Sequence, residues 1–148
     1  MTPEIEAAHR VLREVFVHGR QATDFPQDSA IAGYALLGVL SAFFRNVMER
    51  PFTGHEDEKE IKNHLAALKR SYPSEMDKVK PKRMAQVVLD QIGPGAPPPG
   101  RFRLPMDSGL VHQMRLVAEY TARDEGIVGK ELEMYLDGAC ARYYTGGY

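Results

Sequence analysis

The sequence predicts an all-α fold, a single-domain bundle of five to seven helices with an exposed loop rich in glycine and proline. Apolar residues recur every three or four positions along most of the chain. Capping residues and prolines stand where these stretches begin, and no alternating apolar runs flank a hairpin turn. The 148 residues, 43% of them hydrophobic, are enough for one domain with a sizeable core. We therefore expect a main bundle at 1–92, a loop at 93–105 and a docked helical hairpin at 106–148, all in one domain, 1–148.

The first two helices are the clearest. A first helix is predicted to begin at Pro3, because Thr2 can cap it and proline fits the first turn, and to end near Gly19. A second helix is predicted from about Ser29 to Arg50. It is apolar nearly all round before Arg45, which is typical of a helix surrounded by others. We expect this helix to lie at the centre of the fold.

The next two helices are delimited by prolines and a cap. Pro51 ends the central helix, and the segment Thr53–Glu56 fits a capping box, in which Thr and Glu satisfy each other's backbone N–H groups at the start of a helix. Pro73 closes that third helix. Pro81 then occupies the first position of a fourth.

The loop that follows contains Gly-Pro-Gly-Ala-Pro-Pro-Pro-Gly at 93–100. None of its side chains is expected to join the core, and three consecutive prolines favour an extended, semi-rigid conformation. Beyond it, Asp107 or Ser108 caps a helix that Gly126 ends, and a last helix is predicted from about Val128 to Tyr144.

Composition excludes several classes of protein. A single cysteine, Cys140, cannot form an intramolecular disulfide and favours a reducing compartment. The N-terminal residues 1–20 have no apolar core of the kind that a secretion signal needs. The longest uncharged run, 29–44, is shorter than the about 20 apolar residues of a membrane span. We therefore expect a cytoplasmic protein that does not enter a membrane.

Cofactors and metals are not indicated by any motif. No glycine-rich nucleotide fingerprint is present, and the Glu6-x-x-His9 unit lacks the second unit that a di-iron site requires. Cys140 lies close to the buried face of the last helix and is expected to be a core residue.

Charge is distributed unevenly along the chain. The 19 basic and 20 acidic residues nearly cancel, but residues 1–61 carry a net charge of −4, residues 62–103 carry +6 and residues 104–148 carry −3. The positive segment flanks the proline-rich loop. Its candidate binding residues are Lys69, Arg70, Lys78, Lys80, Lys82, Arg83, Arg101 and Arg103.

Two tyrosines near the C-terminus, Tyr144 and Tyr148, are hard to bury internally because they follow the end of the apolar stripe. Tyrosine is enriched at protein interfaces. Together with the basic block and the loop, they predict a non-catalytic protein-interaction module, an adaptor, inhibitor or assembly factor, that binds another protein or its own copy. A first alternative is nucleic-acid binding by the basic block at 69–103.

A second alternative comes from Arg50 and His55. Their Arg-x4-His spacing resembles that of the HEPN ribonucleases, which are also small all-α proteins. The resemblance covers six residues and implies ribonuclease activity, in which Arg50 would stabilise charge and His55 would move a proton.

Overall fold

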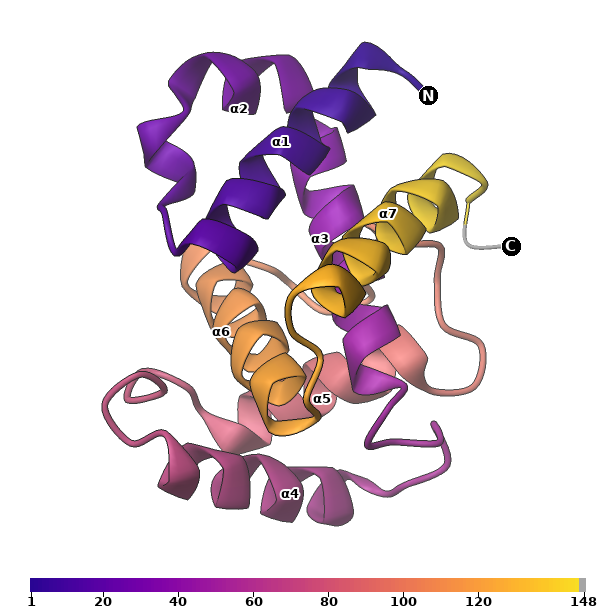
Figure 1. Cartoon of the computed structure of the whole chain (residues 1–148). Coiled ribbons are helices and arrows are strands. Elements are labelled where there is room, and N and C mark those ends of the chain that lie inside the picture. Colours follow the sequence, from indigo (N-terminus) through magenta and orange to yellow (C-terminus); the bar gives the residue numbers. More distant parts are fainter. Residues whose placement is uncertain (147–148) are drawn as a thin grey trace.

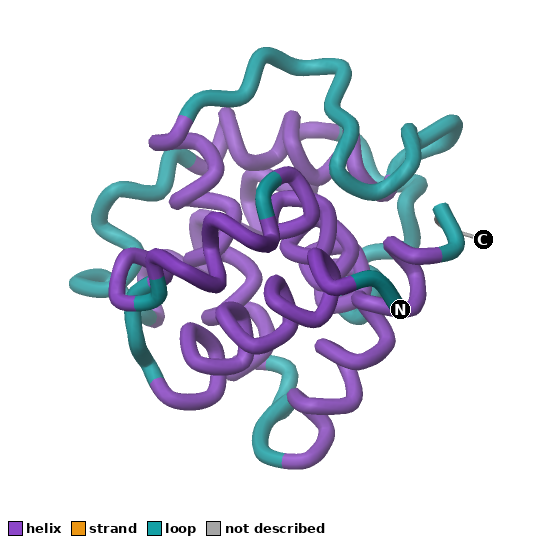
Figure 2. The backbone as a smooth tube through the Cα atoms, turned by 90° about the horizontal axis from the view of Figure 1, so that it is seen from above, coloured by secondary structure: helices purple, strands orange, loops and turns teal. Residues whose placement is uncertain are grey.

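The computed structural model describes residues 1–146, and this range is helical without any strand, as the sequence predicts (Figure 1). The elements are α1 (Pro3–His18), η1, a 3₁₀-helix (Ala22–Asp24), α2 (Pro26–Ala32), α3 (Tyr34–Met48), α4 (Glu58–Ser71), α5 (Pro81–Ile92), α6 (Ser108–Asp124) and α7 (Lys130–Tyr144). Loops lie mainly around the outside of the helices (Figure 2).

Helix α3 is the centre of the fold. It packs against α1, α5, α6 and α7, and every residue from Gly38 to Arg45 is buried. The predicted central position is confirmed. Burial of this stretch on all sides explains why the sequence is apolar nearly all round before Arg45.

The predicted continuous helix from Ser29 to Arg50 is wrong. The chain bends by 85° between α2 and α3, at Gly33, whose φ of 52° and ψ of −129° are accessible almost only to glycine. The apolar pattern continues across the bend, so periodicity could not reveal it. Among residues 1–146, no single helix is long and apolar enough to cross a membrane, although the bent pair α2 and α3 passes the same test of length and composition.

The helix after Pro51 begins later than predicted. The hydrogen bond expected of the capping box forms, since Glu56 Oε1 accepts from the backbone N–H of Thr53 at 2.7 Å. That hydrogen bond closes a turn before the helix and does not cap it. The cap of α4 is Asp57, whose side chain accepts from the N–H of Glu60 at 2.8 Å. Two other predicted caps are confirmed: Thr2 Oγ1 accepts from the N–H of Ile5, and Asp107 Oδ1 accepts from that of Leu110.

The last two helices do not pack mainly on each other as a hairpin. Helix α7 lies on α3 and α1, whereas α6 lies on α3, α4 and α5. Both are therefore integral parts of the bundle around α3.

The proline loop, residues 93–105, runs at the surface but is fixed to the bundle. The expectation that no side chain of 93–100 joins the core is wrong for Pro99, which is buried. Gly100 lies against Gly38 of α3, where a Cβ on Gly100 would stand 2.9 Å from the Gly38 Cα. The close approach needs two residues without side chains, so the loop is held against the bundle.

Candidate functional site

The eight basic residues predicted as one block occupy two places. Six surround the connection between α4 and α5, at the lower left of Figure 1, and form what we call the basic turn: Lys69, Arg70, Lys78, Lys80, Lys82 and Arg83. Five of them are exposed, while Lys69 is half-buried and its Nζ donates to the carbonyl oxygen of Val79 at 2.8 Å.

The basic turn encloses two acidic residues, Glu75 and Asp77, but its positive charges are not neutralised by ion pairs within the range that the structure describes. None of its six residues enters an ion pair there. Its field reaches α6: the pKa of His112 is lowered by burial, and further by the positive charges of Arg115 and Lys78. Binding of nucleic acid or of an acidic protein by this turn stays a prediction.

Arg101 and Arg103 lie past the opposite end of α5. The Arg103 Nε donates to Asp90 Oδ1 at 3.0 Å, and Asp90 is only 7% exposed. Arg103 thus serves to attach the proline loop to α5. The Arg101 side chain is exposed, but its carbonyl oxygen accepts from Gln91 Nε2 at 3.1 Å.

Arg50 and His55, the residues of the ribonuclease alternative, have different surroundings. Arg50 Nη1 donates to Glu131 Oε1 at 3.1 Å and to the Tyr135 hydroxyl at 2.9 Å, both on α7. His55 is exposed, and no hydrogen bond joins it to Arg50 in the part of the chain described. Ribonuclease activity therefore gains no geometric support and stays a prediction.

Cys140 is fully buried, as expected. Burial raises the pKa of its thiol to about 11, with a smaller contribution from the negative charge of Asp137. A thiol in this environment is poorly suited to act as a nucleophile near neutral pH.

Tyr144 belongs to an exposed apolar surface that the sequence did not reveal. The apolar face, as we call it, consists of Ile31, Tyr34 and Tyr144, which are 51%, 94% and 59% exposed. They line a shallow hollow of about 660 Å³ between the start of α1, the bend at Gly33 and the end of α7. Tyr148, the other predicted tyrosine, lies outside the described residues.

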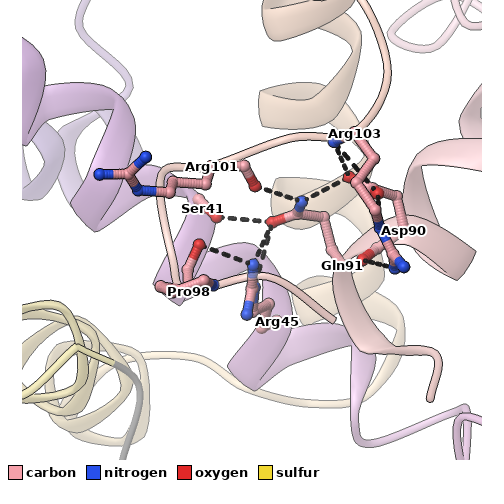
Figure 3. A network of polar contacts seen from close by, with 7 residues as sticks. All are labelled: Ser41, Arg45, Asp90, Gln91, Pro98, Arg101 and Arg103. Atoms are coloured by element: carbon pink, nitrogen blue, oxygen red, sulfur yellow. Dashed lines mark hydrogen bonds and ion pairs between the residues drawn. The ribbon is translucent and has the colours of Figure 1, made fainter. Parts of the chain in front are cut away.

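A buried polar network links α3, α5 and the proline loop (Figure 3). At its centre is Gln91, whose Oε1 accepts from Ser41 Oγ at 2.7 Å and from Arg45 Nε and Nη2 at 3.0 and 2.9 Å. Its Nε2 donates to Asp90 Oδ2 at 2.9 Å, besides the Arg101 carbonyl. Arg45 Nη2 also donates to the carbonyl oxygen of Pro98 at 3.2 Å. The proline loop is therefore held by groups that are almost fully buried.

Beside this network lies a cavity of about 380 Å³, which we call the Arg45 cavity. Its polar side chains come from Arg45, Glu49, Thr53, Gln91 and Arg142, and Pro97–Pro99 form one wall. Arg142, on α7, donates from Nη1 to Asn46 Oδ1 at 2.7 Å and to Glu49 Oε1 at 2.6 Å.

Arg45 is an unusual residue for a position buried inside the bundle. It is only 3% exposed, yet its hydrogen-bond acceptors are the neutral oxygens of Gln91 and Pro98. The pKa of its guanidinium is lowered to about 10, mainly by burial and also by the nearby charge of Arg142, against the opposing effects of Asp90 and Glu49.

In the sequence, Arg45 stands out only as the end of an apolar stretch. The available signal was its place on that stretch: Arg45 follows Ser41 by four positions and Gly38 by seven, so it shares their face of the buried helix. A charge on that face had to find polar partners elsewhere in the chain.

No group of three or more His, Cys, Asp or Glu side chains in residues 1–146 is arranged to hold a metal ion. His9, from the half-motif, instead bonds Asp137 at 2.9 Å. Comparisons with protein-family models, with curated proteins and with solved structures find no match to this chain.

Proposed function

We propose that this chain is a protein-interaction module that acts by binding and not by catalysis, and that its partner docks on the apolar face. The observation that carries the proposal is the position of Tyr34, which is 94% exposed beside two further exposed apolar side chains at one hollow. Contiguous exposed apolar surface is characteristic of interaction sites. Tyrosine is enriched among the residues that contribute most binding energy at interfaces.

The lining of the hollow defines the chemistry of the partner. Glu4 is the one charged residue among the described residues that line it. A partner that fits presents an apolar side chain to the hollow and a lysine or arginine to Glu4. The basic turn lies on the other side of the molecule from the end of α7 (Figure 1), so it would contact a different part of a large partner or a different molecule.

A photo-crosslinking experiment tests the proposal. Replacing Tyr34 by the photoreactive residue p-benzoyl-phenylalanine and irradiating cells of the native host should give one covalent adduct of defined mass. The matched control places the same residue at Met134, which is 68% exposed on α7 and does not line the hollow. An adduct of twice the chain's mass would identify a second copy as the partner. Absence of an adduct from position 34, or the same adducts from both positions, contradicts the proposal.

A further inference from the structure

The Arg45 cavity contains a cationic nitrogen without a partner. Arg45 Nε and Nη2 are engaged by Gln91 and Pro98, whereas Nη1 forms no hydrogen bond with any residue in 1–146. Figure 3 accordingly draws contacts to one terminal nitrogen of Arg45 and none to the other. Although Nη1 has no hydrogen bond, it is not one of the fully buried atoms that lack a partner, so it is accessible. Arg45 also lines the cavity. The nitrogen is therefore available to a molecule in that space.

The charges around the cavity leave a net positive charge. Arg45, Arg142 and Glu49 are its charged lining residues within the described chain, and their formal charges give +1. Glu49 is bonded to Arg142 and is itself 49% exposed, so water screens it better than it screens the buried Arg45. A buried arginine that is hydrogen-bonded only to neutral groups gains most from a negatively charged acceptor.

The other lining residues indicate the chemistry of the uncharged part of the ligand. Ile92, Ala96 and the prolines Pro97–Pro99 supply apolar wall, and Thr53 supplies a hydroxyl. Apolar walls with a few polar groups at fixed places, within a few hundred Å³, are typical of small-molecule sites.

We infer that the Arg45 cavity binds a small organic monocarboxylate, whose carboxylate accepts from Arg45 Nη1 and from Arg142 and whose apolar or aromatic body lies against the proline loop. A monoanion matches the net charge of +1, whereas a phosphate dianion would leave an excess of negative charge beside Glu49. This site is separate from the apolar face and does not depend on the proposed function.

Benzoate is a suitable probe, with phenyl phosphate as the dianionic comparison, and binding is measured by isothermal titration calorimetry in a buffer without other carboxylates. Wild-type protein should bind benzoate more tightly than phenyl phosphate. Arg142→Gln should weaken benzoate binding about tenfold, since it removes one charge-assisted hydrogen bond. Arg20→Gln, which changes the same charge at a surface position outside the cavity, should bind benzoate as wild type does.

A second variant tests the opposite direction. Glu49→Gln should strengthen benzoate binding severalfold, because it releases Arg142 and raises the net charge of the lining to +2. Circular dichroism of each variant establishes that it is folded. The inference is overturned if wild type does not bind benzoate, if Arg142→Gln and Glu49→Gln both bind as wild type does, or if phenyl phosphate binds more tightly than benzoate.

Discussion

Gln91 is the residue on which the interior polar network depends. A single amide satisfies a serine hydroxyl and a buried guanidinium through its oxygen, and a carboxylate and a loop carbonyl through its nitrogen. An isolated charge in a protein interior is strongly unfavourable, so Arg45 can remain buried only while such acceptors are present. The roles of Gln91 and Arg45 are therefore inseparable.

Replacement of Gln91 by alanine should destabilise the protein by about 3 kcal/mol, because it leaves Arg45 and Ser41 without their shared acceptor. Urea unfolding followed by circular dichroism measures the change. The matched control is Gln86→Ala on the same helix, since Gln86 is half-buried and its side chain forms no hydrogen bond with another described residue. Its effect should be about 1 kcal/mol or less. Equal effects of the two changes would show that the network contributes little.

At the scale of the elements, the packing of α7 on α3 depends on the absence of a side chain at one position. Gly38 faces the ring of Tyr143, and a Cβ at Gly38 would overlap that ring. The same residue receives Gly100 of the proline loop on α3. Gly38 thus allows two different segments to approach α3 closely, although glycine lowers the intrinsic stability of a helix by up to about 1 kcal/mol.

Gly38→Ala should therefore destabilise the fold by about 1 to 3 kcal/mol, since the overpacking outweighs the gain in helix propensity. Gly138 on α7 provides the opposite case: a Cβ there would meet Asn46 Nδ2 at 3.7 Å, an ordinary contact. Gly138→Ala should stabilise the protein by up to about 1 kcal/mol. Thermal unfolding of the two variants distinguishes them, and a shift of the same sign in both would contradict the packing argument.

At the scale of the whole molecule, both ends of the chain meet on α3. The N-terminal α1 and the C-terminal α6 and α7 all pack against that helix. Side chains also join these distant segments, as when Arg13 of α1 pairs with Glu133 of α7 at 2.6 Å. We therefore expect that the main bundle and the last two helices are not separately stable.

Residues 1–105 alone should not fold cooperatively, because removal of α6 and α7 exposes α3, whose buried residues include Phe43 and Phe44. Near-ultraviolet circular dichroism and urea titration measure this, with the full chain as the reference. A fragment with fixed tertiary signals and a sigmoidal unfolding transition would contradict the expectation.

Local patterns were sufficient to predict the helical class, most helix ends and the central position of α3. Caps such as Thr2 and Asp107 act within one turn of the chain, and apolar periodicity follows directly from helix geometry. The basic turn was likewise predictable in large part, because most of its residues are close in sequence and exposed.

The tertiary structure decided what the sequence could not determine. The 85° bend at Gly33 brings Ile31 and Tyr34 to the hollow shared with Tyr144. Arg45 finds its acceptors 46 and 53 positions away, in Gln91 and Pro98. The sequence by itself determined which segments are helical, since that depends on neighbours along the chain. The apolar face and the Arg45 cavity depend on contacts between segments that are distant in the sequence. Those contacts are determined by how the helices pack around α3, which local sequence patterns do not specify.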